Sequence, residues 1–452
     1  MATRNTGFSS SFGAIMAAAG SAIGLGNIWR FPYICGKYGG AACLIVYLIF
    51  VFLIGMVLMM SEFIIGRRSQ HAPVKAFPTL RPDKPGWKLV GVLGMITCIL
   101  ILAIYLVISG WTLGYFTESV DGTLATIPDD GFSAHFAAFA ASSWKPVLFL
   151  LIFLFFTLLV VIGGVQKGIE KVSKLLMPLL LVLVLVLCVR SITLPGASRG
   201  LDYLFHPDFS LLTWEGILAI LGQALFSLSV GMGAMIVYGS YLPKDENILK
   251  TSLWITVCDV SIAILAGVAI FPAVFACGQN PAGGPGLVYQ VLPVVFNSLG
   301  SIGNILSIIF FLLLTLAALT SAISLLETLT AWLSDKGMKR LPAALVVSLA
   351  EAILGIVVAY SFSGGILSSF TPGGINLFDW VDRITGSYLP PICALLTILF
   401  FGWVMKRDDI HNELSNGGTI RIRWFGLFYH VLARFIAPIA LLTIIVAGVL
   451  GL

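Results

Sequence analysis

Charged residues are scarce in this sequence. Lys and Arg total 26 and Asp and Glu total 21 among 452 residues, so only 10% of the chain is charged, whereas 58% is hydrophobic. Soluble domains usually carry about 25% charged residues. The composition therefore excludes an ordinary soluble protein and predicts an all-α integral membrane protein with many spans.

Motifs for metal, disulfide or nucleotide chemistry are also missing. The seven cysteines lack CxxC spacing, and the five histidines form neither an HExxH motif nor a Ser/His/Asp set. Two GxG elements lack the third glycine and the preceding strand of a nucleotide fingerprint. We therefore expect a protein that is not an enzyme, with no nucleic-acid partner despite its net charge of +5.

Long apolar runs dominate the chain. A helix needs about 20 apolar residues to cross a bilayer, and about eleven such runs are present. They cover residues 10–35, 41–66, 88–116, 146–164, 170–189, 213–240, 251–277, 301–333, 341–362, 376–405 and 426–451.

Basic residues gather in alternate loops between these runs. The clusters lie at 67–88, 167–174, 244–250, 336–340 and 406–423. By the positive-inside rule these loops are cytoplasmic. With eleven spans, we expect a multi-pass protein of the cell inner (plasma) membrane, with the N-terminus in the cytoplasm and the C-terminus outside.

The first run is interrupted by Gly20-Ser21-Ala22-Ile23-Gly24-Leu25-Gly26. Backbone this flexible is tolerated at membrane depth only where it lines a cavity or coordinates a ligand. The free amides near Leu25 and Gly26 should attract a carboxylate, and the carbonyls of 20–23 should attract cations. The break therefore predicts a binding site.

A matching break, Ser229-Val230-Gly231-Met232-Gly233, occurs five runs later. Paired broken helices are typical of transporters built from inverted repeats. We expect a single transporter domain over 1–452, with repeats at 8–190 (spans 1–5) and 213–405 (spans 6–10). The span at 426–451 is then an addition.

Two sets of polar residues lie inside the runs. Ala317, Thr320 and Ser321 share one helical face and offer oxygen ligands to a hard cation, although Thr and Ser also commonly bond to their own helix. The second set is Asn27, Ser227 and Asp259. An intramembrane carboxylate usually faces a partner or a cavity, but a loop-end position facing water is the alternative for Asp259.

Further polar residues are candidates for gates at the two ends. On the outer side, Arg30 and Asp382, with Asp379 nearby, form an ion pair that closes a vestibule, or they are single charges that extend to the membrane interface. The other candidates are Gln223, and on the inner side Arg4, Tyr241 and Asp335. Glu62 is expected to accept hydrogen bonds from unwound backbone, whereas Glu327 and Glu351 are intramembrane acids without an assigned role.

The segment Gly20-x-Ala22-Ile23-Gly24-Leu25-Gly26-Asn27-Ile28-Trp29-Arg30-Phe31-Pro32 resembles the first helix of neurotransmitter:sodium symporters. Further similarity runs through Glu62, Tyr105, 226–234, 238–244, 317–321 and Asp382. The resemblance implies a LeuT-type fold, with a 5+5 inverted repeat, discontinuous helices 1 and 6, and two Na⁺ sites beside a central substrate pocket. Transporters of this family are among the proteins that define the inverted-repeat class, so the paired breaks and the resemblance are one line of evidence.

The resemblance also implies the ligands of both sodium ions. The first would bind the Ala22 carbonyl, Asn27, Ser227, Asp259 and the substrate carboxylate. The second would bind the carbonyls of Gly20, Ile23 and Ala317 and the hydroxyls of Thr320 and Ser321.

The implied substrate pocket has a polar end and an apolar end. Tyr105 would hold a carboxylate, and Gly24 stands where relatives that carry amines without a carboxylate have an Asp. The pocket would comprise Ala22, Gly24, Leu25, Gly26, Ile101, Tyr105, Phe226, Ser227, Ser229, Met232, Ser321 and Leu325. We therefore expect sodium-coupled import of hydrophobic or aromatic L-amino acids by alternating access. The alternatives are a sensor that binds without transport, and a symporter of a small amino acid or osmolyte.

Several positions depart from the family pattern or carry a mechanistic expectation. Asp259 stands where several relatives have Asn, and Ala263 stands where some bacterial members have an acid. A fixed carboxylate at the first sodium site could replace the chloride that many animal relatives need, so we expect transport without chloride. Gly168 and Pro178 resemble a spacing that permits unwinding of span 5, and Pro lacks the donor for a continuous helix. Arg4 and Phe8 replace the usual Arg-x-x-Trp latch. The oligomeric state stays open.

Overall fold

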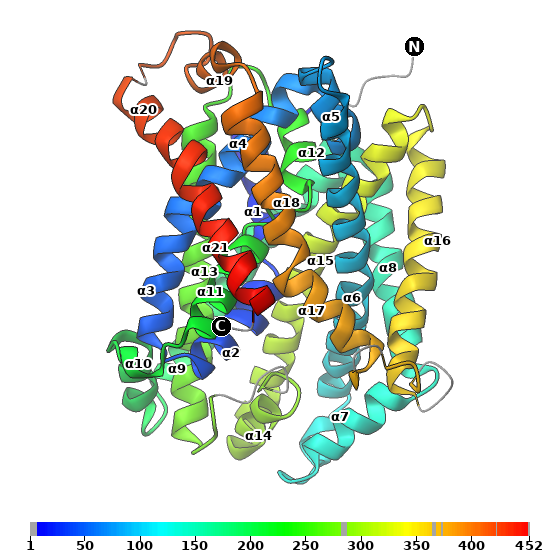
Figure 1. Cartoon of the computed structure of the whole chain (residues 1–452). Coiled ribbons are helices and arrows are strands. Elements are labelled where there is room, and N and C mark those ends of the chain that lie inside the picture. Colours follow the sequence, from blue (N-terminus) through cyan, green and yellow to red (C-terminus); the bar gives the residue numbers. More distant parts are fainter. Residues whose placement is uncertain (1–6, 282–286, 364–367, 372–373, 422, 451–452) are drawn as a thin grey trace.

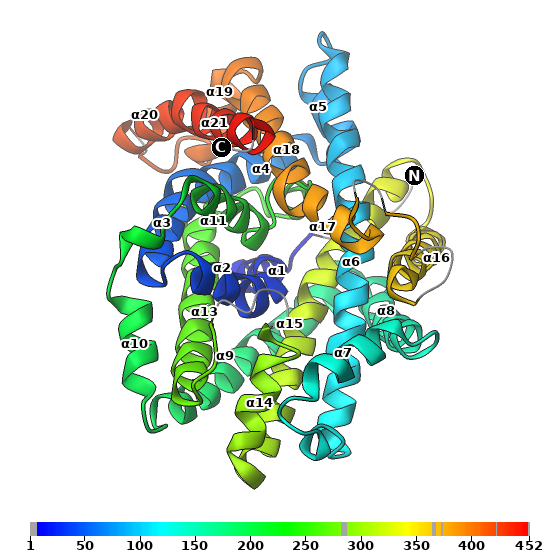
Figure 2. The same cartoon turned by 60° about the horizontal axis from the view of Figure 1, so that its bottom comes forward.

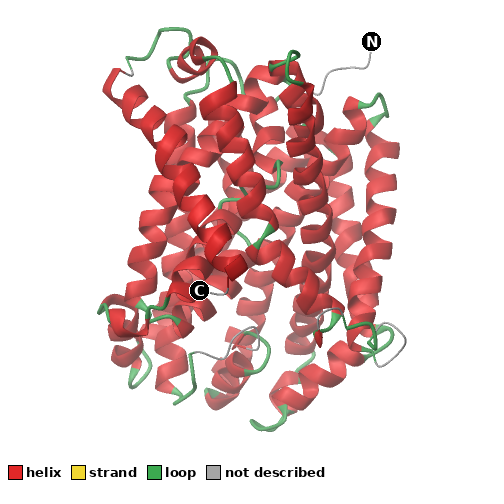
Figure 3. Ribbon diagram, viewed as in Figure 1, coloured by secondary structure: helices red, strands yellow, loops and turns green. Residues whose placement is uncertain are grey.

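The computed structural model describes residues 7–281, 287–363, 368–371, 374–421 and 423–450. Within them the chain is helical, and its only β pairing is an isolated bridge between Gly40 and Pro207. Figure 3 shows the helices running roughly parallel through the molecule and joined mainly by short loops. This arrangement satisfies the backbone groups within each helix, as a bilayer requires.

In the first half of the chain, the first apolar run forms two helices instead of one, and several helices are extended by a π-helical turn. The α-helices are α1 (Ser11–Ala22), α2 (Phe31–Lys37), α3 (Ala41–Phe50), α4 (Met56–Ser69), α5 (Pro73–Leu80), α6 (Lys88–Val120), α7 (Phe132–Ala141), α8 (Lys145–Ile162), α9 (Lys171–Ile192) and α10 (Ala197–Phe205). The π-helical turns are η1 (Gly26–Arg30), η2 (Val51–Gly55) and η5 (Val165–Glu170), and the 3₁₀ turns are η3 (Pro85–Trp87) and η4 (Leu124–Thr126).

The second half follows a similar plan. Its α-helices are α11 (Trp214–Ser227), α12 (Ala234–Ser240), α13 (Ile248–Ala276), α14 (Val291–Ser298), α15 (Gly300–Asp335), α16 (Arg340–Ala359), α17 (Leu377–Ser387), α18 (Leu389–Leu399), α19 (Arg407–Leu414), α20 (Arg423–Val431) and α21 (Ala437–Leu450). The shorter turns are η6 (Phe209–Leu211), η8 (Tyr360–Phe362), η10 (Phe400–Val404) and η11 (Leu432–Ile436).

The number of membrane spans differs from the expected eleven when helix length is the criterion. In the described part of the chain, nine helices are long and apolar enough to cross a bilayer, and the bent pair Ser11–Ala22 and Gly26–Lys37 makes a possible tenth. The remaining expected span, 213–240, is divided into α11 and α12, and neither half is long enough alone. This difference therefore comes from the break within that span.

The break between α11 and α12 follows from its backbone and its neighbours. Ser229, Gly231 and Gly233 have φ values of 53°, 79° and 80°, which end a right-handed helix. A Cβ on Gly231 would lie 2.4 Å from the Pro390 carbonyl oxygen, and one on Gly233 would lie 2.5 Å from Pro73 Cγ. Only glycine fits this close approach, so these two glycines determine where the helix is interrupted.

The first broken helix lies at the centre of the bundle (Figure 2), and α12 of the second is buried along nearly all of its length. Figure 2 shows α1 enclosed by longer helices, among them α6, α13 and α15. Small and apolar residues of α1, including Ala14, Ala17 and Ala19, are fully or almost fully buried. The helices α5 and α19 lie at one end of the molecule, and α7, α10 and α14 lie at the other (Figure 1).

Candidate functional site

The first break lies between α1 and η1, where the axis bends by 48°. Ile23 leaves the helix with φ −76° and ψ 105°, although its N–H still donates to the Ala19 carbonyl over 2.7 Å. The Leu25 N–H donates to the Tyr105 hydroxyl of α6 over 3.1 Å. A backbone donor of the break therefore points at a phenol from a neighbouring span.

Gly24 is packed closely between two hydroxyl groups. A Cβ at this position would lie 2.2 Å from Ser321 Oγ and 2.7 Å from the Tyr105 hydroxyl oxygen. Real Cβ atoms do not make such contacts, so any larger side chain has to displace α6 or α15 groups. The space that an amine-binding Asp would need is occupied by Tyr105 and Ser321.

The predicted set of Asn27, Ser227 and Asp259 is brought together by η1, α11 and α13. Asn27 Nδ2 donates to Asp259 Oδ1 over 2.7 Å and lies 3.1 Å from Ser227 Oγ. Ser227 Oγ lies 2.8 Å from Asp259 Oδ1 and 3.0 Å from Oδ2. All three residues are at most 1% exposed, so the alternative of a loop-end Asp259 facing water is wrong.

Sequence reasoning missed a fourth member of this cluster, Tyr47 of α3. Its hydroxyl donates to Asp259 Oδ2 over 3.0 Å and lies 3.1 Å from Ser227 Oγ. The signal was a tyrosine in the middle of an apolar run. Among the described residues, the groups that contact the Asp259 carboxylate are all neutral donors. A buried carboxylate without a positively charged partner suits a site for a cation.

The polar face of α15 meets the other end of the same break. Thr320 Oγ1 lies 3.3 Å from the Ile23 carbonyl oxygen and 2.9 Å from its own helix carbonyl at Ala317. A Cβ on Gly20 would lie 3.4 Å from Thr320 Cβ, so α1 and α15 are in contact here. Thr320 thus contacts its own helix at Ala317 and also the Ile23 carbonyl of the break. These contacts bring one hydroxyl and two carbonyl oxygens together.

Ser321 turns to a different carbonyl of the break. Its hydroxyl donates to the Ser21 carbonyl over 3.1 Å, and Ser229 Oγ donates to the same oxygen over 2.8 Å. Ser21 was not among the predicted site residues. Its carbonyl joins both broken spans to α15.

A central cavity lies between these clusters. It is lined by Ser21, Ala22, Gly24, Gly26, Ile101, Tyr105, Phe226, Ser229, Met232, Ser321 and Leu325. The predicted residues Leu25 and Ser227 are not in the lining: Leu25 contributes its N–H to Tyr105, and Ser227 faces Asp259. The cavity leaves open about 20 Å³, roughly the space of one water molecule.

Three residues close the cavity on the side of α17. Gln223 Nε2 donates to the Gly26 carbonyl over 2.8 Å. The Arg30 guanidinium lies over the Phe226 ring, 5.1 Å from its centroid, and donates to the Gly386 carbonyl over 3.3 Å. Among the described residues, Arg30 and Asp382 do not form an ion pair. Arg30 instead reaches the Gly386 carbonyl, which lies one turn after Asp382 on α17.

The inner gate residues separate into two clusters. Tyr241 donates to Glu327 Oε1 over 2.6 Å, and Arg340 binds the same carboxylate over 3.0 and 2.5 Å. Asp335 instead accepts from the Ala72 N–H over 2.6 Å. Asp335 also contacts His71 at 3.3 Å. Among the described contacts, Tyr241 and Asp335 therefore lie in separate clusters, and Glu327, which the sequence left without a role, is the acceptor of the first.

The start of α1 is attached to η5 and α12. Ser9 donates through its N–H to Glu170 Oε2 over 2.8 Å, and the Phe8 N–H donates to the Tyr241 carbonyl over 3.0 Å. Phe8 also packs edge-on against Tyr238 and Tyr241. Arg4 lies outside the described residues. The helix α9 runs through Pro178 without a break in this structure.

Two buried acids in the spans, Glu62 and Glu351, each have an Oε2 atom without a hydrogen-bond partner among the described residues, but they differ in the contacts of the rest of the carboxyl group. Glu62 Oε1 accepts the Gly231 N–H over 2.7 Å, as expected for a carboxylate beside unwound backbone. Glu351 of α16 is 1% exposed, and its Oε2 atom has no hydrogen-bond partner among the described residues.

A helical bundle with two broken central spans that converge on a small cavity and on oxygen-lined clusters is typical of a secondary transporter. The model of the sodium:neurotransmitter symporter family matches residues 5–128 and 133–452, and the chain belongs to this family.

Similar proteins extend over nearly the whole chain. An uncharacterized sodium-dependent transporter of Bacillus subtilis, YhdH, is 39% identical and covers 97% of this chain and 96% of its own length. One of Haemophilus influenzae is 33% identical over 98% of this chain and 97% of that protein. The crystal structure of MhsT in complex with L-phenylalanine matches with a TM-score of 0.90 and 43% identity, over 98% of this chain and 99% of that one. The expected LeuT-type fold is confirmed.

Proposed function

We propose that this protein is a sodium-coupled symporter that imports hydrophobic or aromatic L-amino acids. The observation that carries the proposal is the contact of the Tyr105 hydroxyl with the Leu25 N–H, beside Gly24. A hydroxyl donor and the free amides of a helix N-terminus form a suitable site for a carboxylate. The amino acid would then extend its side chain toward Ile101, Phe226 and Met232.

Asp259 and its neighbours support a first sodium site. Ser227 Oγ lies 2.8 Å from the buried Asp259 carboxylate, and hard cations prefer such oxygen ligands. Asn27 reaches the same carboxylate through Nδ2 while its Oδ1 accepts the Gly24 N–H, so its amide would have to turn to join the Ala22 carbonyl as a ligand. The substrate carboxylate, held by Tyr105, would complete this set. Because each ligand then raises the affinity for the other, coupling between sodium and substrate is reciprocal.

Thr320 and the α1 carbonyls support a second sodium site. The contacts of Thr320 with the carbonyls of Ile23 and Ala317 bring the oxygens of α15 to the end of the first half-helix. That end carries the negative pole of the helix dipole. Ser321 would have to turn from the Ser21 carbonyl to join this set.

Transport would proceed by alternating access. The layer formed by Gln223, Arg30 and Phe226 would open toward the outside, and the contacts of Glu327 and Glu170 would open toward the cytoplasm. The positive charge of the loops near α5 and α19 favours a cytoplasmic location for that end of the molecule. The inverted repeats 8–190 and 213–405 would supply the two halves that move against each other.

The substrate class rests on the lining of the cavity. Ile101, Phe226, Met232 and Leu325 offer an apolar surface, and methionine adapts its shape readily. The open volume of about 20 Å³ means that lining side chains such as Phe226 or Met232 have to move to admit any amino acid. A small substrate such as glycine needs the smallest movement and is the second candidate.

The test is uptake into proteoliposomes that contain the purified protein. Labelled Leu, Phe, Trp, Gly and GABA are supplied with and without an inward sodium gradient, in chloride and in gluconate. We expect sodium-driven accumulation of Leu, Phe and Trp in both salts. Preferred uptake of Gly would establish the second candidate, loss of uptake in gluconate would remove chloride independence, and binding without accumulation would indicate a sensor.

A further inference from the structure

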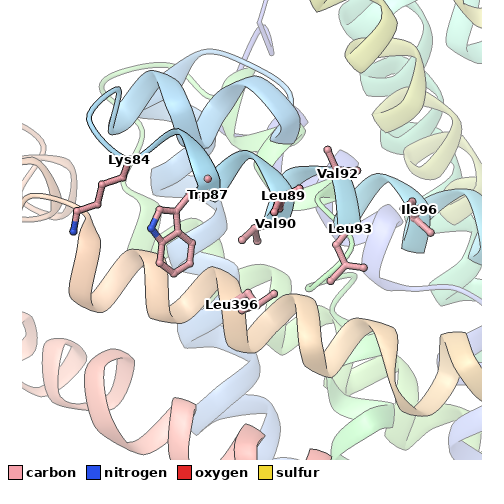
Figure 4. Close-up of a pocket in the computed structure, with 9 residues that line it drawn as sticks. Lys84, Trp87, Leu89, Val90, Val92, Leu93, Ile96 and Leu396 are labelled. Atoms are coloured by element: carbon pink, nitrogen blue, oxygen red, sulfur yellow. The ribbon is translucent and has the colours of Figure 1, made fainter.

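A lateral groove lies between the start of α6 and the helix α18, away from the central cavity. Figure 4 shows it lined by Leu89, Val90, Leu93 and Ile96 of α6 and by Leu396 of α18. Its volume is about 710 Å³, within the range of about 300–1,000 Å³ that ligand sites occupy. Leu89 and Ile96 are 71% and 45% exposed, so the groove opens toward the outside of the bundle.

One end of the groove is polar. Lys84 and Trp87 lie there, and Figure 4 shows the Lys84 side chain on the outer side of the indole ring, with its amine pointing away from the apolar residues. Trp87 also packs against Phe400, with ring centroids 5.4 Å apart, which fixes the ring at the mouth of the groove. Tryptophan with lysine at the end of an apolar span marks the boundary between hydrocarbon and headgroups.

Basic residues outnumber acids in the segment that forms this end. Within 72–88 the only acid is Asp83, which binds Arg81 over 2.5 Å. The hydrogen bond from Arg81 lowers the pKa of Asp83 to about 2, so this carboxylate stays charged and committed to Arg81. Lys75, Lys84 and Lys88 form no ion pair with the described residues. An anionic group is the complementary ligand.

We propose that this groove binds an anionic phospholipid, with an acyl chain along α6 and α18 and the phosphate at Lys84. The apolar lining would contact an acyl chain, and the lysine without an ion-pair partner would bind a phosphate. Because the two features adjoin at a membrane boundary, one phospholipid molecule could contact both. Basic pockets between spans on the cytoplasmic side recognise anionic headgroups in this way. A soluble anion would use the lysine but not the apolar walls.

The walls of the groove are connected to the break between α11 and α12 from two sides. A Cβ on Gly91 of α6 would lie 2.4 Å from the Pro73 carbonyl, and Pro73 packs against Gly233. On the other wall, α18 presents the Pro390 carbonyl to Gly231. A lipid between α6 and α18 therefore acts on the spacing of two helices that clamp the broken span, and its occupancy alters the transport rate.

The first experiment measures retained lipid. The protein is extracted from vesicles of equal parts phosphatidylcholine and phosphatidylglycerol and analysed by native mass spectrometry. We expect bound phosphatidylglycerol in the wild type and about fivefold less in Lys84→Glu, as one lysine near an anionic headgroup implies. Ile96→Trp fills the apolar wall and leaves Lys84 in place, and it should lower retention as well. Lys339→Glu, an exposed lysine at the start of α16, is the matched control and should retain the lipid.

The two variants distinguish binding in the groove from a general effect of surface charge. Equal retention in the wild type and in Lys84→Glu would overturn the site. Loss in Lys84→Glu but not in Ile96→Trp would indicate a surface charge effect, which also overturns it. Size-exclusion profiles and thermal melting confirm that each variant is folded. Lipid retention is measured without substrate or sodium. The result can therefore be interpreted even if the proposed transport function is wrong.

A second measurement tests the effect on transport. Uptake is compared in phosphatidylcholine alone and in the equal mixture, using whichever substrate the protein accumulates. We expect the wild type to respond to phosphatidylglycerol and Ile96→Trp not to respond. An unchanged wild-type rate would overturn the coupling to the broken span.

Discussion

The Asn27 amide nitrogen lies 2.7 Å from Oδ1 of Asp259 and joins the broken first span to α13. The hydroxyls of Ser227 and Tyr47 reach the same carboxylate, so four elements converge on one buried charge. Each of these contacts comes from a neutral donor. The geometry therefore leaves the negative charge of Asp259 available to a cation.

Replacing Asp259 with Asn keeps the size of the side chain and removes its charge. We expect the sodium concentration for half-maximal uptake to rise at least about tenfold, because unit charges about 4 Å apart interact by about 4 kcal/mol at an effective dielectric of about 20. Sodium-dependent uptake in proteoliposomes measures the effect. Asp129→Asn, an exposed acid in the loop between η4 and α7, is the control, and an unchanged sodium dependence in Asp259→Asn would contradict the first sodium site.

Gly24→Ala tests the close packing beside Tyr105. The added Cβ would lie 2.2 Å from Ser321 Oγ and 2.7 Å from the Tyr105 oxygen, so these groups have to move. We expect overpacking to cost about 1–3 kcal/mol and substrate binding to fall at least about tenfold. Gly86→Ala is the control, because nothing lies within 4 Å of a Cβ there. Binding at wild-type affinity in Gly24→Ala would show that Gly24 does not shape the pocket.

Two tyrosines of α6 allow a matched comparison of hydroxyl groups. The Tyr105 hydroxyl contacts the Leu25 N–H over 3.1 Å, whereas the buried Tyr115 hydroxyl has no partner among the described residues. We expect Tyr105→Phe to weaken substrate binding about tenfold, through loss of a hydrogen bond to a charged carboxylate worth about 1.5–3 kcal/mol. Tyr115→Phe should leave binding unchanged. Equal effects of both variants, measured by equilibrium binding, would argue against a specific role of Tyr105.

Much of the central architecture could be predicted from the sequence, because it depends on local backbone chemistry. The glycine-rich segments 20–26 and 229–233 weaken a helix, and the structure is interrupted between Ala22 and Gly26 and between Ser227 and Ala234. The i, i+3 and i+4 spacing of Ala317, Thr320 and Ser321 fixes a shared helical face. Each of these predictions depends only on residues within a single span.

Predictions that required the rotation of one span against another were less successful. Tyr47 joins Asp259 only because α3 turns that residue inward, and a tyrosine in an apolar run does not by itself show which way its side chain faces. Arg30 has two acceptors within reach on α17, and side-chain packing over Phe226 selects the Gly386 carbonyl instead of Asp382. On the inner side, Asp335 contacts His71 and the Ala72 N–H, two partners from another element that its own span does not indicate.

Two buried acids, Glu62 and Glu351, provide the last test. Glu62→Leu would leave the Gly231 N–H without the acceptor that lies 2.7 Å away, and an unsatisfied buried donor costs about 1–3 kcal/mol. Glu351→Leu removes a buried polar group whose Oε2 atom has no described partner, so its replacement should be neutral or stabilising. We expect a lower melting temperature for Glu62→Leu and an equal or higher one for Glu351→Leu, measured in the same detergent. A marked loss of stability in Glu351→Leu would mean that this carboxyl group has a stabilising partner in the membrane.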